Sequence, residues 1–206
     1  MANTDLNIRV KSKLGTTQQV LLYQEAMTLN IKNFKTAAWE HRYIAPGSKM
    51  DVILPMEVCI GAYEGMGHNG KISTKLLPVE YNTSWDIYNN SGAIDVKKSD
   101  EPSPEEDTIE VHNKNIVTSS AIVTKDGKPL FKCDVRPDFK VSFSLHPKLY
   151  VALSDFEITD PFFDAATISR NPVGIDYEGQ QYLTIILSEN ESTGAVEVNY
   201  DFSKFE

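Results

Sequence analysis

The feature that most constrains the fold is a two-residue alternation of apolar and polar side chains. It begins at Phe139 and continues to residue 146, and residues 6–10 and 196–202 have the same pattern. Successive side chains of a β-strand point to opposite faces of its sheet, so each of these segments has one apolar and one polar side. One-sided strands are typical of antiparallel sheets. The alternation therefore predicts an antiparallel, all-β protein.

Two segments depart from this rule because their apolar residues are nearly continuous. They are Val52–Leu54 and Leu183–Leu187. A strand that is covered on both faces has this composition, so we expect both segments to be central strands.

Turn signals separate the apolar segments. Asp126-Gly127 lies between two β-rich runs and is typical of a type I′ hairpin, and Ala45–Ser48 and Ser192–Gly194 carry further turn residues. The chain has ten prolines, which leave few windows for a long helix. Many short strands with turns about every ten residues are typical of a sandwich or barrel.

One window is ambiguous between strand and helix. Residues Gln18–Asn30 contain good helix formers, with Leu22, Ala26 and Leu29 on one helical face. We interpret Val20–Glu25 as a strand because it follows a Gly-Thr-Thr turn, and a short helix is the alternative. The predicted strands are 5–11, 19–25, 36–43, 50–60, 71–77, 79–88, 108–111, 115–125, 128–135, 139–146, 148–154, 181–188 and 195–202. The predicted fold is an antiparallel β-sandwich, jelly-roll or Greek-key-like.

The stretch of lowest complexity is residues 98–107, which contain no apolar anchor. We interpret it as a mobile acidic loop within a single domain spanning residues 1–206. A linker between two small β domains is the alternative.

Overall charge excludes one class of partner. Twenty Lys and Arg stand against 29 Asp and Glu, a formal net charge of −9. Binding to a nucleic-acid backbone requires clustered cations, so we expect no nucleic-acid partner. No stretch approaches the ~18 apolar residues of a spanning helix, and no secretory signal is visible. Two cysteines make no disulfide framework, so we expect a cytoplasmic protein.

The charge is unevenly distributed along the chain. Residues 1–50 contain seven Lys or Arg and three Asp or Glu, whereas residues 155–206 contain two and eleven. An acidic solvated surface is one interpretation. Complementary ends that join copies of the chain into a homo-oligomer are the other.

Residues Gly65–Lys71 match the pattern G-x-G-x-x-G. That pattern binds a dinucleotide only where a helix follows it, and here residues 72–75 continue as strand. We therefore interpret the glycines as a hairpin tip. A mobile lip over a pocket, with His68 at its edge, is the alternative.

An acidic run follows the strand at 148–154. Its carboxylates are the candidate calcium ligands Asp155, Glu157, Asp160 and Asp164, because calcium is bound by six to eight oxygens in loose geometry. The EF-hand spacing is absent. Calcium is the one candidate cofactor, and the chain otherwise carries no cofactor motif.

No concentrated catalytic motif is visible. The four histidines lack metal-ligand spacing, and there is no G-x-S-x-G segment. If the chain is an enzyme, its acid–base groups lie near strand ends and loops. The candidates are Asp155, Glu157, His146, Tyr150 and His68.

Residues 20–47 carry a family resemblance. Leu21-Leu22-Tyr23-Gln24-Glu25, then Ala38-Trp39 and Ala45-Pro46-Gly47, resemble the N-terminal part of the small rhizosphere-expressed protein family of rhizobia. This resemblance implies a compact bacterial β-rich protein and no catalytic residues.

Together these observations favour a non-enzymatic β-sandwich module for ligand binding or self-assembly, with a small molecule or glycan as ligand. An isomerase- or cyclase-type enzyme with its pocket in the sandwich is one alternative. Calcium-assisted binding to a lipid or carbohydrate surface is another.

Overall fold

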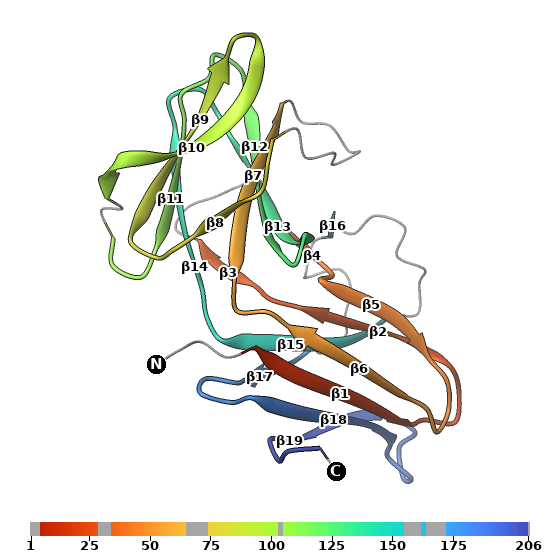
Figure 1. Cartoon of the computed structure of the whole chain (residues 1–206). Coiled ribbons are helices and arrows are strands. Elements are labelled where there is room, and N and C mark those ends of the chain that lie inside the picture. The colour runs from red at the N-terminus through yellow and green to blue at the C-terminus, as the bar shows by residue number, and fades with distance from the viewer. Residues whose placement is uncertain are drawn as a thin grey trace.

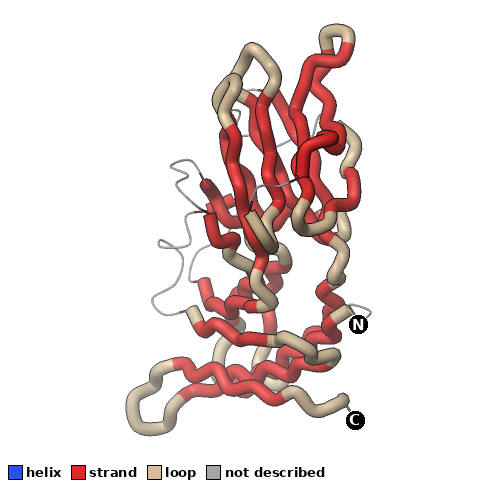
Figure 2. The backbone as a smooth tube through the Cα atoms, turned by 90° about the vertical axis from the view of Figure 1, so that its left-hand side faces the viewer, coloured by secondary structure: helices blue, strands red, loops and turns tan. Residues whose placement is uncertain are grey.

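The computed structural model describes residues 5–28, 34–64, 74–102, 105–154, 162–163 and 172–205. Every regular element in these residues is a β-strand (Figure 2). The strands form four sheets, which we name sheets A to D. The all-β class predicted from the alternation is therefore confirmed.

Sheets A and B lie at one end of the molecule (Figure 1). Sheet A has the order β19-β18-β1-β6 and consists of Val196–Asp201, Tyr182–Glu189, Leu6–Lys13 and Lys49–Leu54. Sheet B has the order β17-β15-β2-β5 and consists of Val173–Asp176, Lys148–Ser154, Gln18–Tyr23 and Glu40–Ile44.

Sheets C and D lie at the other end. Sheet C has the order β10-β9-β11-β14-β3 and consists of Ala93–Pro102, Thr83–Asn90, Ile109–Asn113, Lys140–Leu145 and Ala26–Thr28. Sheet D has the order β16-β4-β13-β12-β7-β8 and consists of Phe162–Phe163, Phe34–Ala37, Lys128–Val135, Ser119–Lys125, Val58–Glu64 and Leu77–Val79.

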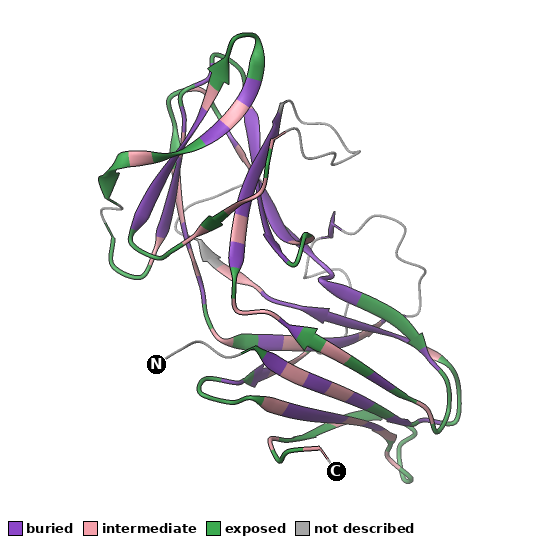
Figure 3. Ribbon diagram, viewed as in Figure 1, coloured by how far each residue is buried: buried purple, intermediate pink, exposed green. Residues whose placement is uncertain are grey.

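The inner faces of all four sheets contribute to one large buried cluster. Ile8 of sheet A, Leu22 of sheet B, Val111 of sheet C and Val123 of sheet D are each fully buried in it. Along β1 the buried side chains alternate with more exposed ones, and Figure 3 shows this as alternating colours. The two-residue pattern of the sequence is thus the pattern of burial.

The chain passes between the two pairs of sheets at short connections. Among the described residues these are 24–25, 38–39, 55–57 and 146–147. The two pairs of sheets therefore meet where these connections run. Whether the chain counts as a single domain stays a prediction.

Sheets A and C are mixed, whereas sheets B and D are purely antiparallel. β1 pairs with β18 in parallel, and β11 pairs with β9 in parallel, while the other pairs are antiparallel. The sequence alternation could not reveal this, because it describes faces and not strand direction.

The ambiguous window forms strands. In its described part, residues 18–28, β2 and β3 are present, so the strand interpretation is confirmed and the helix is wrong. Leu22 packs into the main cluster and Leu21 into a second cluster on the opposite face of sheet B. Burial on both faces explains why this strand lacks alternation.

Several local predictions were wrong. The expected single strands 36–43 and 50–60 are each divided, at residues 38–39 and 55–57, into two strands of different sheets. Val52–Leu54 belongs to the edge strand β6, and Ile53 is 58% exposed on the outer face of sheet A. Phe139 is 60% exposed because it closes a turn, its N–H bonding to the carbonyl of Arg136, and β14 begins one residue later. β10 continues to Pro102, so residues 98–102 of the expected loop are strand.

The predicted hairpin turn is confirmed. Asp126 and Gly127 have φ of 51° and 70° between β12 and β13. Positive φ at both central residues is the backbone of a type I′ turn.

Candidate functional site

A cavity of about 720 Å³ lies where the chain passes between the two pairs of sheets. Three of the four described connections line it, through Gln24, Met56, Glu57, His146 and Pro147. The remaining lining comes from the β8–β9 connection, the β17–β18 turn and the ends of β7, β8, β11, β12 and β14. The cavity is therefore built from segments that are far apart in the sequence.

Lys125 is the most unusual lining residue, since it is a lysine with only 3% of its surface exposed. It is the last residue of β12, and alternation places it in the inward row with Ala121 and Val123. No hydrogen bond or ion pair to its Nζ is made within the described part of the chain. Burial lowers the pKa of Lys125 to about 8, and the carboxylate of Asp5 opposes this shift.

Gln24 supplies a second polar group in the cavity wall, and it is 1% exposed. Its Nε2 donates to the hydroxyl of Tyr177 at 2.8 Å and lies 3.3 Å from the carbonyl oxygen of His146. Its Oε1 is buried and has no hydrogen-bond partner in the described chain. Burial raises the pKa of Tyr177, so its hydroxyl stays protonated at neutral pH.

The cavity lining contains both apolar and acidic residues. Apolar lining residues are Met56, Val58, Val79, Ile109 and Leu145. Three exposed carboxylates, Glu57, Glu80 and Glu178, also line the cavity. The cavity thus combines one buried cation with apolar side chains and exposed carboxylates.

Of the residues predicted from sequence, the structure places His146 at this cavity. It is exposed and lies in the connection between β14 and β15. Tyr150 lies elsewhere, because its ring stacks on Tyr23 at 5.2 Å beside the second cluster, outside the cavity lining. His146 and Tyr150 therefore do not form one site.

The other predicted site residues lie outside the described residues. These are His68, Asp155, Glu157, Asp160 and Asp164. The calcium hypothesis stays a prediction. Among the residues that the structure does describe, no three His, Cys, Asp or Glu side chains form a group that could hold a metal ion.

Sequence reasoning did not identify Lys125 or Gln24. The available signal was the alternation Ala121, Val123, Lys125, which puts a lysine on an apolar face. That signal is weak at a strand end next to a turn, because most such lysines reach solvent. The sequence around Gln24 does not indicate a binding residue, because its contact with Tyr177 exists only in the folded chain.

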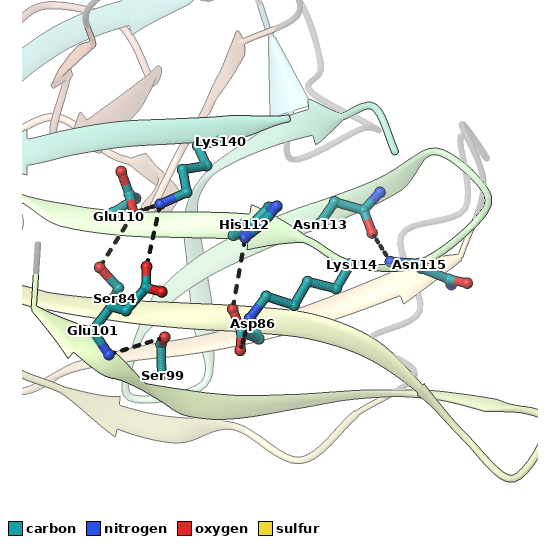
Figure 4. Close-up of polar contacts among 10 residues, drawn as sticks. All are labelled: Ser84, Asp86, Ser99, Glu101, Glu110, His112, Asn113, Lys114, Asn115 and Lys140. Atoms are coloured by element: carbon teal, nitrogen blue, oxygen red, sulfur yellow. Dashed lines mark hydrogen bonds and ion pairs between the residues drawn. The ribbon is translucent and has the colours of Figure 1, made fainter. Parts of the chain in front are cut away.

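A second polar cluster lies on the outer face of sheet C (Figure 4). Lys114 Nζ lies 2.8 Å from an oxygen of Asp86, and His112 Nδ1 is 4.0 Å from the other oxygen. Lys140 Nζ bonds to Glu110 at 2.9 Å, and the Ser84 hydroxyl donates to the same oxygen. The buried carboxylates of this cluster have cationic partners, so it is explained as a structural network, whereas the Lys125 amine has no such explanation.

The structure contains no helix long and apolar enough to cross a membrane within its described residues.

Comparison with known proteins finds one family. The model of the RhiA family matches residues 3–200. This match confirms the resemblance seen in residues 20–47 and extends it over most of the chain. No curated protein and no solved structure matches.

Proposed function

We propose that this chain, which belongs to the RhiA family, is a non-enzymatic binding module that holds a small organic anion in the cavity between its two pairs of sheets. The observation that carries the proposal is the buried amine of Lys125, which lines the cavity without a partner in the described chain. A buried charge is costly unless it is paired. An anionic ligand supplies that pair.

The charge state of Lys125 supports an anion as ligand. With a pKa of about 8, the amine is mainly protonated at pH 7. A bound carboxylate or sulfonate would accept a charge-assisted hydrogen bond from it, which contributes roughly 1.5–3 kcal/mol.

The size and lining of the cavity define the rest of the ligand. Pockets for small molecules are mostly apolar and measure about 300–1,000 Å³, and this cavity measures about 720 Å³. Met56, Ile109 and Leu145 favour an apolar body. Glu57, Glu80 and Glu178 disfavour further negative charge, so we expect a ligand with one anionic group.

Gln24 and Tyr177 add polar specificity. The unpartnered Oε1 of Gln24 accepts a hydrogen bond, so it favours a ligand with a hydroxyl or N–H. The proposal is of binding without turnover.

Anilinonaphthalene sulfonate is a suitable probe, since it has an apolar body and one anionic group. We expect one bound probe per chain and enhanced fluorescence. Lys125→Met should weaken binding by about tenfold or more, because the charge-assisted hydrogen bond is lost. Affinity should also fall as pH rises above the pKa of Lys125, which is about 8 in the unbound chain.

Lys98→Met is the matched control, because Lys98 is exposed on β10 and does not line the cavity. It should leave binding unchanged, and near-ultraviolet circular dichroism should show that both variants are folded. Equal affinity of Lys125→Met and the unmodified chain would refute the proposal.

Other expectations from the sequence stay predictions. A glycan ligand and calcium-assisted surface binding rest on residues that the cavity does not include. The two cysteines, Cys59 and Cys133, are free thiols, which supports the proposed reducing, cytoplasmic location.

A further inference from the structure

We propose that Lys125 also captures apolar aldehydes, with its Nζ attacking the carbonyl carbon of an aldehyde held in the cavity to form an imine. This inference rests on the same cavity as the proposed function and goes beyond it, because it assigns a covalent reaction to one residue.

The geometry provides what an imine requires. Lys125 lines a space of about 720 Å³, which holds a small aromatic or aliphatic aldehyde. Its amine is not engaged by any acceptor of the described chain. By contrast, Lys114 and Lys140 on sheet C are held by Asp86 and Glu110, so their amines are occupied.

The amine is also more nucleophilic than an ordinary lysine. A pKa of about 8 leaves roughly 10% of Lys125 as the free amine at pH 7. An unperturbed lysine has less than ~0.1%. Desolvation in an apolar wall is a recognised way to activate a lysine for reaction with carbonyl compounds.

The reaction balances without an oxidant or reductant. The nitrogen lone pair forms the C–N bond as the C=O π bond opens, and one proton of the amine passes to the carbonyl oxygen, giving a neutral carbinolamine. The carbinolamine then loses its hydroxyl group and the nitrogen proton as water, leaving the C=N bond. The Tyr177 hydroxyl accepts from Gln24 Nε2, and its own proton has no acceptor in the described chain. Tyr177 lines the same cavity, so its hydroxyl is the proposed hydrogen-bond donor to the carbonyl oxygen.

The lining selects the class of aldehyde. Val58, Val79 and Leu145 favour an apolar body, and an uncharged aldehyde does not form the ion pair with Lys125 that would hold its amine protonated. Benzaldehyde meets both conditions. Benzoate is its matched competitor, because it has the same ring but binds the ammonium without forming an imine.

The experiment incubates the full chain with benzaldehyde and sodium cyanoborohydride at pH 7, which reduces the imine to a stable benzylamine. Peptides are then mapped by mass spectrometry after cleavage at acidic residues. We expect the label on Lys125 at least tenfold faster than on the exposed Lys98. Benzoate should slow the labelling of Lys125 and leave that of Lys98 unchanged.

Lys125→Arg separates the two proposals. The arginine keeps a positive charge, so it should retain the sulfonate probe, but it forms no trapped product at residue 125. Labelling of Lys125 without probe binding would support the imine and refute the anion site. Equal labelling of Lys125 and Lys98 in the unmodified chain, or none on Lys125, would overturn the imine whatever the probe does.

Discussion

Lys125 makes the stability of the fold depend on pH in a defined direction. Its pKa is about 8 in the folded chain and about 10.4 when unfolded. Between these values the unfolded state holds a proton that the folded state has released, so the contribution of Lys125 to stability rises with pH. We expect Lys125→Met to be more stable than the unmodified chain at pH 7. Urea unfolding should show this advantage shrinking by about 2 kcal/mol between pH 8 and 10.

This test compares Lys125→Met with the unmodified chain because other groups lower the free energy of unfolding as pH rises. Burial raises the pKa of the Cys133 thiol to about 12, so the unfolded state loses that proton first and stability falls with pH. Subtracting the free energy of unfolding of one chain from that of the other cancels this effect, because both chains contain Cys133. A stability difference that stays constant between pH 8 and 10 would contradict the burial of a titrating lysine.

The β12–β13 hairpin shows how local sequence determines an element. Asp126 and Gly127 both have positive φ, and Gly127 has φ of 70° with open space around its Cβ position. A side chain here adds only backbone strain, of about 1–2 kcal/mol. We expect Gly127→Ala to lower the free energy of unfolding by about 1 kcal/mol, measured by chemical denaturation. Gly15→Ala is the control, because Gly15 lacks positive φ and its Cβ would meet ordinary contacts near Glu189; an equal loss in both variants would refute the turn argument.

Parts of the two charged segments lie side by side in sheet A. β1 pairs with β18, and β19 follows at the edge. The register places the exposed Lys11 and Lys49 opposite each other on the outer face of sheet A, and Glu197 and Asp201 on the same face at the β19 edge. Directly opposed like charges are unfavourable. A second copy related by a twofold axis would set basic side chains against acidic ones.

We therefore expect the predicted self-association to be a dimer through this face. Light scattering after size exclusion should give a larger mass at low salt than at high salt, because exposed charges are screened. Lys11→Glu with Lys49→Glu should abolish the dimer, and adding Glu197→Lys with Asp201→Lys should restore it. Lys98→Glu, on the exposed end of β10, should have no effect. A monomer at low salt would contradict the expectation.

The sequence by itself determined the fold class, the hairpin at Asp126-Gly127 and the inward residues of most strands, since these follow from local geometry and from side-chain alternation. It also suggested His146 near a ligand site. Only the tertiary structure decided that β1 runs parallel to β18, that Ile53 lies at an exposed edge, and that Lys125, Gln24 and Tyr177 line one cavity. Alternation indicates which face of a sheet a side chain lies on. A cavity, however, depends on which connections between strands, far apart in the sequence, lie close together in space. The pairing of strands and the packing of sheets determine this, and no single segment of the sequence encodes either.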